Sequence, residues 1–211
     1  MKRIHDRRAF LALSAAALAG CSGMIGPPEA SPIYVMRPQF PAVAAQKVAW
    51  SLALVRPNAP GALDTDRIAI LQPGGVMDYY AKAQYADALP ALVETALLDA
   101  FERSAALPGV GRTAEGLHSD YHLYTDIKNF EARYDVRDGV PQAVVTLSVR
   151  LVTSRGRITA GTTSVTKTVP ASANSIAAAT AALGEALAGV AREIVTWTLQ
   201  FPPPPAPAAP V

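Results

Sequence analysis

Alternation of apolar and polar side chains with a period of two predicts most of the strands. It is clearest over residues 143–153, where four aliphatic side chains alternate with Thr146, Ser148 and Arg150. Successive side chains of a strand point to opposite faces of a sheet, so this period indicates one buried face. Further strands are predicted by similar or shorter patterns, with 158–169 as a threonine-rich edge strand; they span 33–36, 48–54, 67–71, 76–85 and 158–169.

Two local features modify this pattern. Tyr121, Leu123 and Ile127 share one phase of a strand, whereas Phe130 has the opposite phase, so we expect a β-bulge near Asn129. The glycine-rich stretch 73–75 is not followed by the Lys-Ser or Lys-Thr of a phosphate-binding loop, which favours a hairpin turn. Residues 107–118 are expected to be a loop.

Helical spacing of apolar residues predicts two amphipathic helices, at about 88–104 and about 172–200. The first is expected to begin at Asp87 as N-cap, with Pro90 in its first turn. The second is capped by Ser172, Asn174 or Ser175, and its other face is so rich in alanine and glycine that a second packing partner is expected. The fold class predicted is α+β, with a mostly antiparallel sheet of about five to seven strands packed by these two helices.

The first twenty residues have the three-part order of a secretory signal. Four basic residues precede the apolar run 9–19, which is shorter than the roughly 20 residues that a membrane-spanning helix needs. Leu18-Ala19-Gly20 then leads directly into Cys21, and this stretch resembles the lipobox of bacterial lipoproteins. The resemblance implies cleavage between Gly20 and Cys21, with a diacylglycerol thioether on the sulfur and an N-acyl group such as palmitate on the new amine.

The chain is therefore divided into a signal peptide (1–20), a flexible linker (21–32), an α+β domain (33–200) and a Pro-rich tail (201–211) expected to be disordered. The alternative for 9–19 is a buried helix or a membrane span, with Cys21 as an ordinary core residue. Arg7-Arg8 belongs either to a twin-arginine export signal or to an ordinary basic n-region of the general secretory route. Because Ser22 and not an aspartate follows the cysteine, resemblance to lipoprotein sorting favours the periplasmic face of the outer membrane.

The charge of the mature chain excludes some partners. Removing four of the 19 basic and one of the 17 acidic residues leaves 15 and 16, a net charge of −1. This balance gives no basic face for nucleic acid and no polybasic patch for anionic lipids. Cys21 is the one cysteine, so an intrachain disulfide cannot form.

No catalytic or metal-binding motif is found in the sequence. His118 and His122 lie in a segment that is predicted to be a loop entering a strand, without the carboxylates of a metal-binding helix. No catalytic residue, metal ligand or cofactor is therefore assigned, apart from the lipid on Cys21.

Three stretches resemble the ABC-type transport auxiliary lipoprotein family: Arg67-Ile68-Ala69-Ile70, Asp78-Tyr79-Tyr80 and Tyr85 to Pro90. The similarity covers roughly 34–199, and the family often has tryptophan in place of Tyr85. It implies a non-enzymatic, lipid-anchored subunit of a mammalian-cell-entry (MCE) type transporter, which moves phospholipid or another apolar molecule. The implied partners are a periplasmic MCE protein with its permease and ATPase.

Three of the seven tyrosines lie within 76–85, and Tyr79, Tyr80 and Tyr85 are the candidate residues for binding a lipid or a partner. Self-association into a homo-oligomer is a further expectation. The alternative is that Tyr79 and Tyr85 lie in the core and that Tyr80 is merely half exposed. The alternative functions are a structural lipoprotein that tethers the envelope through its Pro-rich tail, and a periplasmic hydrolase.

Overall fold

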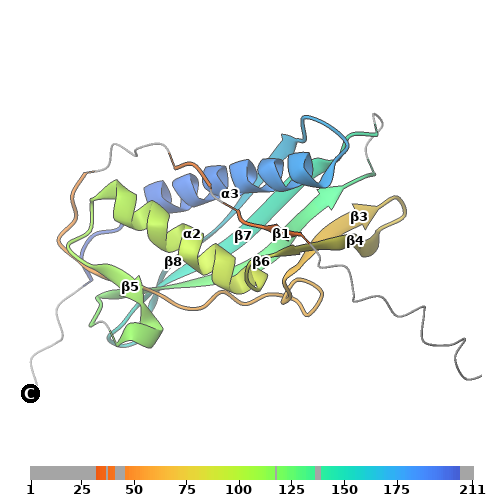
Figure 1. Cartoon of the computed structure of the whole chain (residues 1–211). Helices are drawn as coiled ribbons and strands as arrows, with labels where there is room; N and C mark the ends of the chain where they lie inside the picture. Colours follow the sequence, from red (N-terminus) through yellow and green to blue (C-terminus); the bar gives the residue numbers. More distant parts are fainter. Residues whose placement is uncertain (1–31, 37, 41–45, 117, 136–138, 205–211) are drawn as a thin grey trace, which may run out of the picture. The chain divides into compact units, whose positions relative to one another are not determined.

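The computed structural model describes residues 32–36, 38–40, 46–116, 118–135 and 139–204. Within them, eight strands form one sheet, and two helices pack on the same face of it (Figure 1). The elements are β1 (Ile33–Tyr34), β2 (Leu52–Leu54), β3 (Arg67–Gln72), β4 (Val76–Tyr85), α2 (Leu89–Ser104), β5 (Val110–Arg112), η1 (Thr113–Glu115), β6 (Tyr121–Arg133), β7 (Gln142–Thr153), β8 (Thr159–Pro170) and α3 (Ile176–Thr198). The α+β class is confirmed. The predicted signal peptide and all but the last residue of the linker lie outside the described residues.

The long strands β6, β7 and β8 form an antiparallel meander. The register of β6 against β7 shifts between Ile127 and Asn129, which confirms the predicted bulge and returns Phe130 to the buried face. β8 pairs only with β7, so the threonine-rich strand is an edge strand as predicted.

The opposite edge of β6 is shared by two short strands. β2 pairs in parallel with its first residues and β3 with its last, while β5 adds to β2 and β1 to β4, again in parallel. β3 and β4 form an antiparallel hairpin whose turn includes Gly74 and Gly75 at φ of +84° and +79°, confirming the predicted turn. The sheet has eight strands, one more than the five to seven predicted. It is mixed, but its long pairings are antiparallel as predicted, and the parallel ones involve only two or three residues each.

Both predicted helices are present, with differences at their first residues. The N-cap of α2 is Ala88 and not Asp87, because the amide of Leu89 already donates to the carbonyl of Thr65 (2.9 Å) and Pro90 has no amide hydrogen. α3 begins at Ile176, four residues after the approximate start predicted, and its N-cap is Ser175, one of the three predicted caps, which accepts a hydrogen bond from the amide of Ala178 (3.2 Å).

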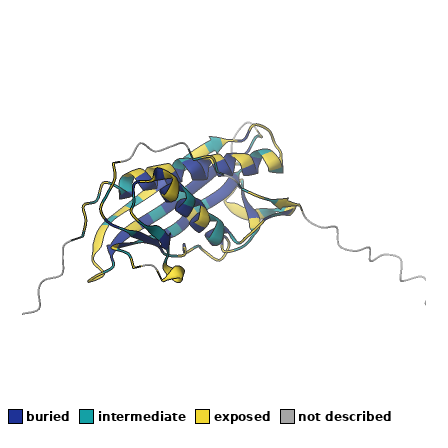
Figure 2. Ribbon diagram, turned by 60° about the vertical axis from the view of Figure 1, so that its left-hand side comes forward, coloured by how far each residue is buried: buried dark blue, intermediate teal, exposed yellow. Residues whose placement is uncertain are grey.

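The core lies between the helices and the sheet, where Figure 2 shows the buried positions gathered. α2 packs against α3, and this contact explains the alanine-rich face of α3 because small side chains let the two helices approach closely. A side chain at Gly184 would also come within 3.3 Å of Met36, so the N-terminal segment lies against α3 as well. The predicted second packing partner is therefore α2 together with this segment.

The chain after α3 continues along the end of the sheet. Trp50 Nε1 donates to the carbonyl of Phe201 (3.0 Å), and the hydroxyl of Tyr121 donates to the carbonyl of Pro202 (2.9 Å). The segment 201–204 is therefore fixed to the domain, which corrects the prediction of a disordered tail beginning at residue 201; residues 205–211 lie outside the described part.

Neither helix of the described residues is both long and apolar enough to span a bilayer.

Candidate functional site

The predicted lipidation and cleavage residues, Gly20 and Cys21, lie outside the described residues. The candidate tyrosines all lie on β4, but the structure places them in three different surroundings. A β-bulge with Lys82 at φ +54° interrupts this strand, so residues before and after it do not keep a simple alternation. None of the three lines either of the two pockets described below.

Tyr79 is half-buried and holds a neighbouring loop. Its hydroxyl donates to the carbonyl of Ala62 (2.9 Å), and the Arg67 guanidinium lies 3.7 Å from the centre of its ring. This cation–π contact orients the cation at the surface of the sheet. Tyr79 therefore holds the loop at Ala62 through its hydroxyl, while part of its ring stays exposed.

Tyr80 is also half-buried and belongs to a chain of polar groups that reaches α3's N-terminal side. Its hydroxyl is 2.8 Å from that of Tyr134, which in turn donates to Asn174 (3.0 Å). The rings of Tyr80 and Tyr134 meet edge to face, with centroids 6.4 Å apart. Burial, and then the hydrogen bond to Tyr134, raise the pKa of the Tyr80 phenol, so this hydroxyl stays protonated.

Tyr85 is a core residue, with 1% of its surface exposed. Its ring packs edge to face against Phe130, and burial raises the pKa of its phenol. Within the described part of the chain its hydroxyl has no hydrogen-bond partner. This placement agrees with the alternative weighed from the sequence, a core position, and leaves no surface for direct contact with a ligand.

The two histidines do not form a metal site. His118 is exposed in the loop before β6, and His122 is half-buried within β6 beside Ala53 and Val152. Burial, with the charge of Arg157, lowers the pKa of the His122 imidazole. In the ranges that the structure describes, no three histidine, cysteine or carboxylate side chains come together as potential metal ligands.

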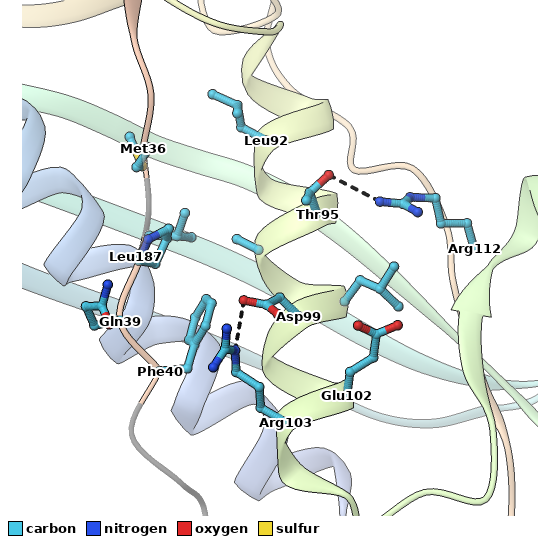
Figure 3. A pocket seen from close by; sticks show the side chains of 13 residues that line it. Met36, Gln39, Phe40, Leu92, Thr95, Asp99, Glu102, Arg103, Arg112 and Leu187 are labelled. Atoms are coloured by element: carbon cyan, nitrogen blue, oxygen red, sulfur yellow. Dashed lines mark hydrogen bonds and ion pairs between the residues drawn. The ribbon is translucent and has the colours of Figure 1, made fainter.

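A pocket that the sequence did not predict lies between the N-terminal segment and α2 (Figure 3). It has a volume of about 520 Å³. Its floor is apolar and its rim is charged; the apolar members are Met36, Pro38, Phe40, Leu92, Ala96, Leu98 and Leu187, and the polar ones are Gln39, Thr95, Asp99, Glu102, Arg103 and Arg112. Such a lining suits an apolar group with a polar end.

The rim of this pocket is ordered by two arginines. Arg103 forms an ion pair with Asp99 one turn earlier on α2 (3.0 Å). Arg112, on β5, donates to Thr95 (3.2 Å) and pairs with Glu115 (3.1 Å) and, at 3.8 Å, with Glu94. Hydrogen bonds from the Arg112 backbone and side chain lower the pKa of the Glu115 carboxyl.

A second pocket of about 510 Å³ lies on the other side of the same N-terminal segment, against α3. Its lining includes Tyr34, Val35, Thr180, Gly184 and Ala188. Residues just after β1 thus separate two hollows over the helical layer. Neither hollow was predicted, because the sequence pattern does not reveal that residues before 40 return across the helices.

Comparison with known proteins identifies the family of this chain. The family model of the ABC-type transport auxiliary lipoprotein component matches residues 34–195, which include every strand after β1's first residue and nearly all of α3. The chain belongs to this family. The auxiliary lipoprotein family was the one suggested by the residues on β3 and β4, and that prediction is confirmed.

Two proteins are similar to this chain over most of its length. An uncharacterized protein of Bradyrhizobium diazoefficiens is 32% identical over 190 residues, which are 86% of this chain and 49% of that protein. The chain therefore spans about half the length of this curated relative. A crystal structure of a Xanthomonas campestris protein is 29% identical with a TM-score of 0.76, over 80% of this chain and 95% of that one.

A second crystal structure, of an uncharacterized protein, is 13% identical with a TM-score of 0.60 over 79% of this chain and 99% of that one. At this identity the likeness concerns the fold alone. The auxiliary lipoprotein thus shares its sheet and two helices with proteins of diverged sequence, while its pockets are described from its own residues.

Proposed function

We propose that this auxiliary lipoprotein is a non-enzymatic subunit of an MCE-type ABC transporter, anchored by lipid on Cys21 to the periplasmic face of the outer membrane. It would help to move phospholipid or another apolar molecule between the two membranes. The observation that carries the proposal is the family match over 34–195, which begins 13 residues after Cys21, itself in a stretch that resembles a lipobox. The partners would be a periplasmic MCE protein and, through it, the permease and ATPase.

The pocket beside α2 supports a role in binding an apolar group. Its floor joins Met36 and Phe40 of the N-terminal segment to Leu92 of α2, and its rim is held by ion pairs. A volume of about 520 Å³ lies within the range of about 300–1,000 Å³ that small-molecule sites occupy. We assign this pocket, with the accessible edges of Tyr79 and Tyr80 as a second surface, to contact with a partner or lipid.

The test is affinity purification of the lipidated protein from gently solubilised envelopes, followed by mass spectrometry of copurifying proteins and extraction of bound lipid. We expect an MCE protein, a lipid, or both. Recovery of neither, from envelopes in which the bait itself is abundant, would overturn the proposal.

Anchoring is tested separately with Cys21→Ser. Loss of the sulfur prevents thioether formation, so the variant should move from the membrane to the soluble fraction, and the processed wild-type N-terminus should carry the mass of its acyl chains. A membrane-bound variant, or an unmodified N-terminus in the wild type, would contradict the anchor.

A further inference from the structure

Exposed apolar side chains concentrate on the β1–β4 side of the sheet. Among the described residues five large apolar side chains are exposed, and four of them lie on or beside these strands: Ile33, Val35, Val76 and Met77. Val76 is 60% exposed and Met77 37%. The fifth, Ile158, lies in the β7–β8 turn at the opposite end of the sheet. Val76 and Met77 are adjacent at the hairpin turn, whereas Ile33 and Val35 lie beside the other end of β4. Exposed apolar side chains that adjoin one another can mark a surface that contacts another molecule or a membrane.

The β3–β4 hairpin presents two of these side chains at its tip, which we define as residues 72–77. Leu71 pairs with Arg133, the last residue of β6, so the tip extends past the end of that strand (Figure 1). No charged residue occurs from Ile68 to Met77. The tip is therefore uncharged, projecting and partly apolar, and insertion into a lipid leaflet would not require a charge to leave water.

The residues that follow the tip suit the head-group region of a membrane. Asp78 is exposed and directly follows Met77, so its carboxylate would limit insertion to the tip itself. Next comes Tyr79, with the Arg67 guanidinium 3.7 Å from its ring centre. Tyrosine rings favour the membrane interface, and guanidinium groups bind phosphate.

The direction of the chain relates this tip to the anchor. β1 runs parallel to β4, with Ile33 opposite Gln84, so the chain enters β1 from the side on which the hairpin tip lies. Val76 pairs with Gln72 and Gln84 with Arg67, so with its bulge this part of β4 spans five residues of β3, roughly 17 Å at about 3.3 Å each. The eleven residues from Ser22 to Pro32 can span up to roughly 38 Å, which is enough for Cys21 to lie at the level of the tip.

We propose that the hairpin tip inserts Val76 and Met77 into the lipid leaflet that holds the Cys21 anchor, with Tyr79 and Arg67 at the level of the head groups. The inference rests on the lipid anchor of the proposed function. It orients the domain with β1 and the hairpin toward the membrane and the β7–β8 turn away from it. The partner is a phospholipid surface, and the pockets over the helices stay accessible from the periplasm.

The lipidated chain offers a selective test, because its one cysteine is used by the anchor. Met77→Cys introduces a unique thiol at the tip, and Ile158→Cys is the matched control at the opposite end. Each is labelled with an environment-sensitive fluorophore and reconstituted into phosphatidylcholine vesicles with and without nitroxide-labelled lipid. We expect a blue shift and severalfold quenching at position 77 and no change at position 158.

The outcomes distinguish a failure of the lipid anchor from a failure of the hairpin tip to insert. Vesicle flotation reports the anchor: protein that does not float contradicts the anchor and the insertion together. Protein that floats with an unquenched label at 77, or with equal quenching at 77 and 158, overturns the insertion and leaves the proposed function intact. If the tip contacts a protein instead of lipid, the fluorescence of the label at position 77 shifts to the blue only when envelope proteins are added. That result also overturns the insertion.

Discussion

The indole nitrogen of Trp50 donates a hydrogen bond to the carbonyl oxygen of Phe201, 151 residues later in the chain, at 3.0 Å. The two residues join the segment before β2 to the segment after α3. Around this bond, the ring of Trp50 meets that of Tyr121 edge to face, and the ring of Phe201 meets that of Trp197 in the same way, with centroids 5.0 and 4.9 Å apart. The segment before β2 and the segment after α3 are thereby held together at one end of the sheet.

Trp50→Phe should remove this hydrogen bond while keeping an aromatic ring against Tyr121. A hydrogen bond of this kind contributes about 1 kcal/mol, and the smaller ring also leaves part of a buried site empty. The free energy of unfolding should therefore fall by at least about 1 kcal/mol. Urea unfolding measures it, and hydrogen exchange should become faster at the amide of Phe201. Unchanged exchange there would show that the bond does not hold the segment.

Gly161→Ala should displace Phe201. A Cβ at position 161 would lie 2.5 Å from Cζ of the Phe201 ring, closer than any real contact. Overpacking of this kind costs about 1–3 kcal/mol. The control is Gly61→Ala, where a Cβ would meet no atom within 4 Å and the backbone φ is not positive. Equal stabilities of the two variants would contradict the close packing of Phe201.

Thr95→Trp should fill the pocket beside α2. Thr95 is exposed on the helix and lines the pocket, so the larger side chain can enter it without disturbing the core. We expect recovery of the copurifying partner or lipid to fall about tenfold, which corresponds to about 1.4 kcal/mol. Thr196→Trp, exposed on α3, is the matched control and should bind normally. Normal binding by both variants would exclude this pocket.

The burial of Glu131 predicts that the free energy of unfolding depends on pH. It is 1% exposed, and burial raises the pKa of its carboxyl, although hydrogen bonds from the amide of Phe130 (2.7 Å) and from Asn129 (3.1 Å) act in the opposite direction. The folded state therefore holds this proton more tightly than the unfolded state. Above the unfolded value of about 4.3, ionisation of Glu131 destabilises the folded protein as pH rises.

Glu131→Gln removes this ionisation. The variant should gain stability relative to the wild type as pH rises from about 4 toward 7, with the difference constant once the folded carboxyl is ionised. Chemical unfolding at several pH values provides the comparison. Parallel curves for the two proteins would mean that burial does not alter the proton affinity of this carboxyl.

The long antiparallel elements could be predicted because their signals are local. The phase change between Ile127 and Phe130 indicated the bulge in β6, and the Gly74-Gly75 pair indicated the β3–β4 turn; both are present. In contrast, β5 has only three residues and pairs in parallel with β2, so neither alternation nor a turn distinguished it from the loop expected at 107–118. Parallel pairing has no sequence signal of its own.

The candidate site was less predictable, because it too depends on contacts between segments that are distant in sequence. Tyr79, Tyr80 and Tyr85 lie close together in sequence, but the bulge at Lys82 and the packing of Phe130 send them to different surroundings. The pocket beside α2 forms because Met36 and Phe40 lie against this helix. These residues are about 50–60 positions before those of α2, and a periodic pattern of apolar residues does not predict a contact over such a distance in sequence.

The pairing of β6 has a consequence for the order of events during biogenesis. Both β2 and β3 pair with β6, which is synthesised some 60 residues after them, and α3 is synthesised later still. Native pairing of this kind closes large loops and is correspondingly slow. A nascent chain therefore cannot complete the pairing of its first half until β6 has been made.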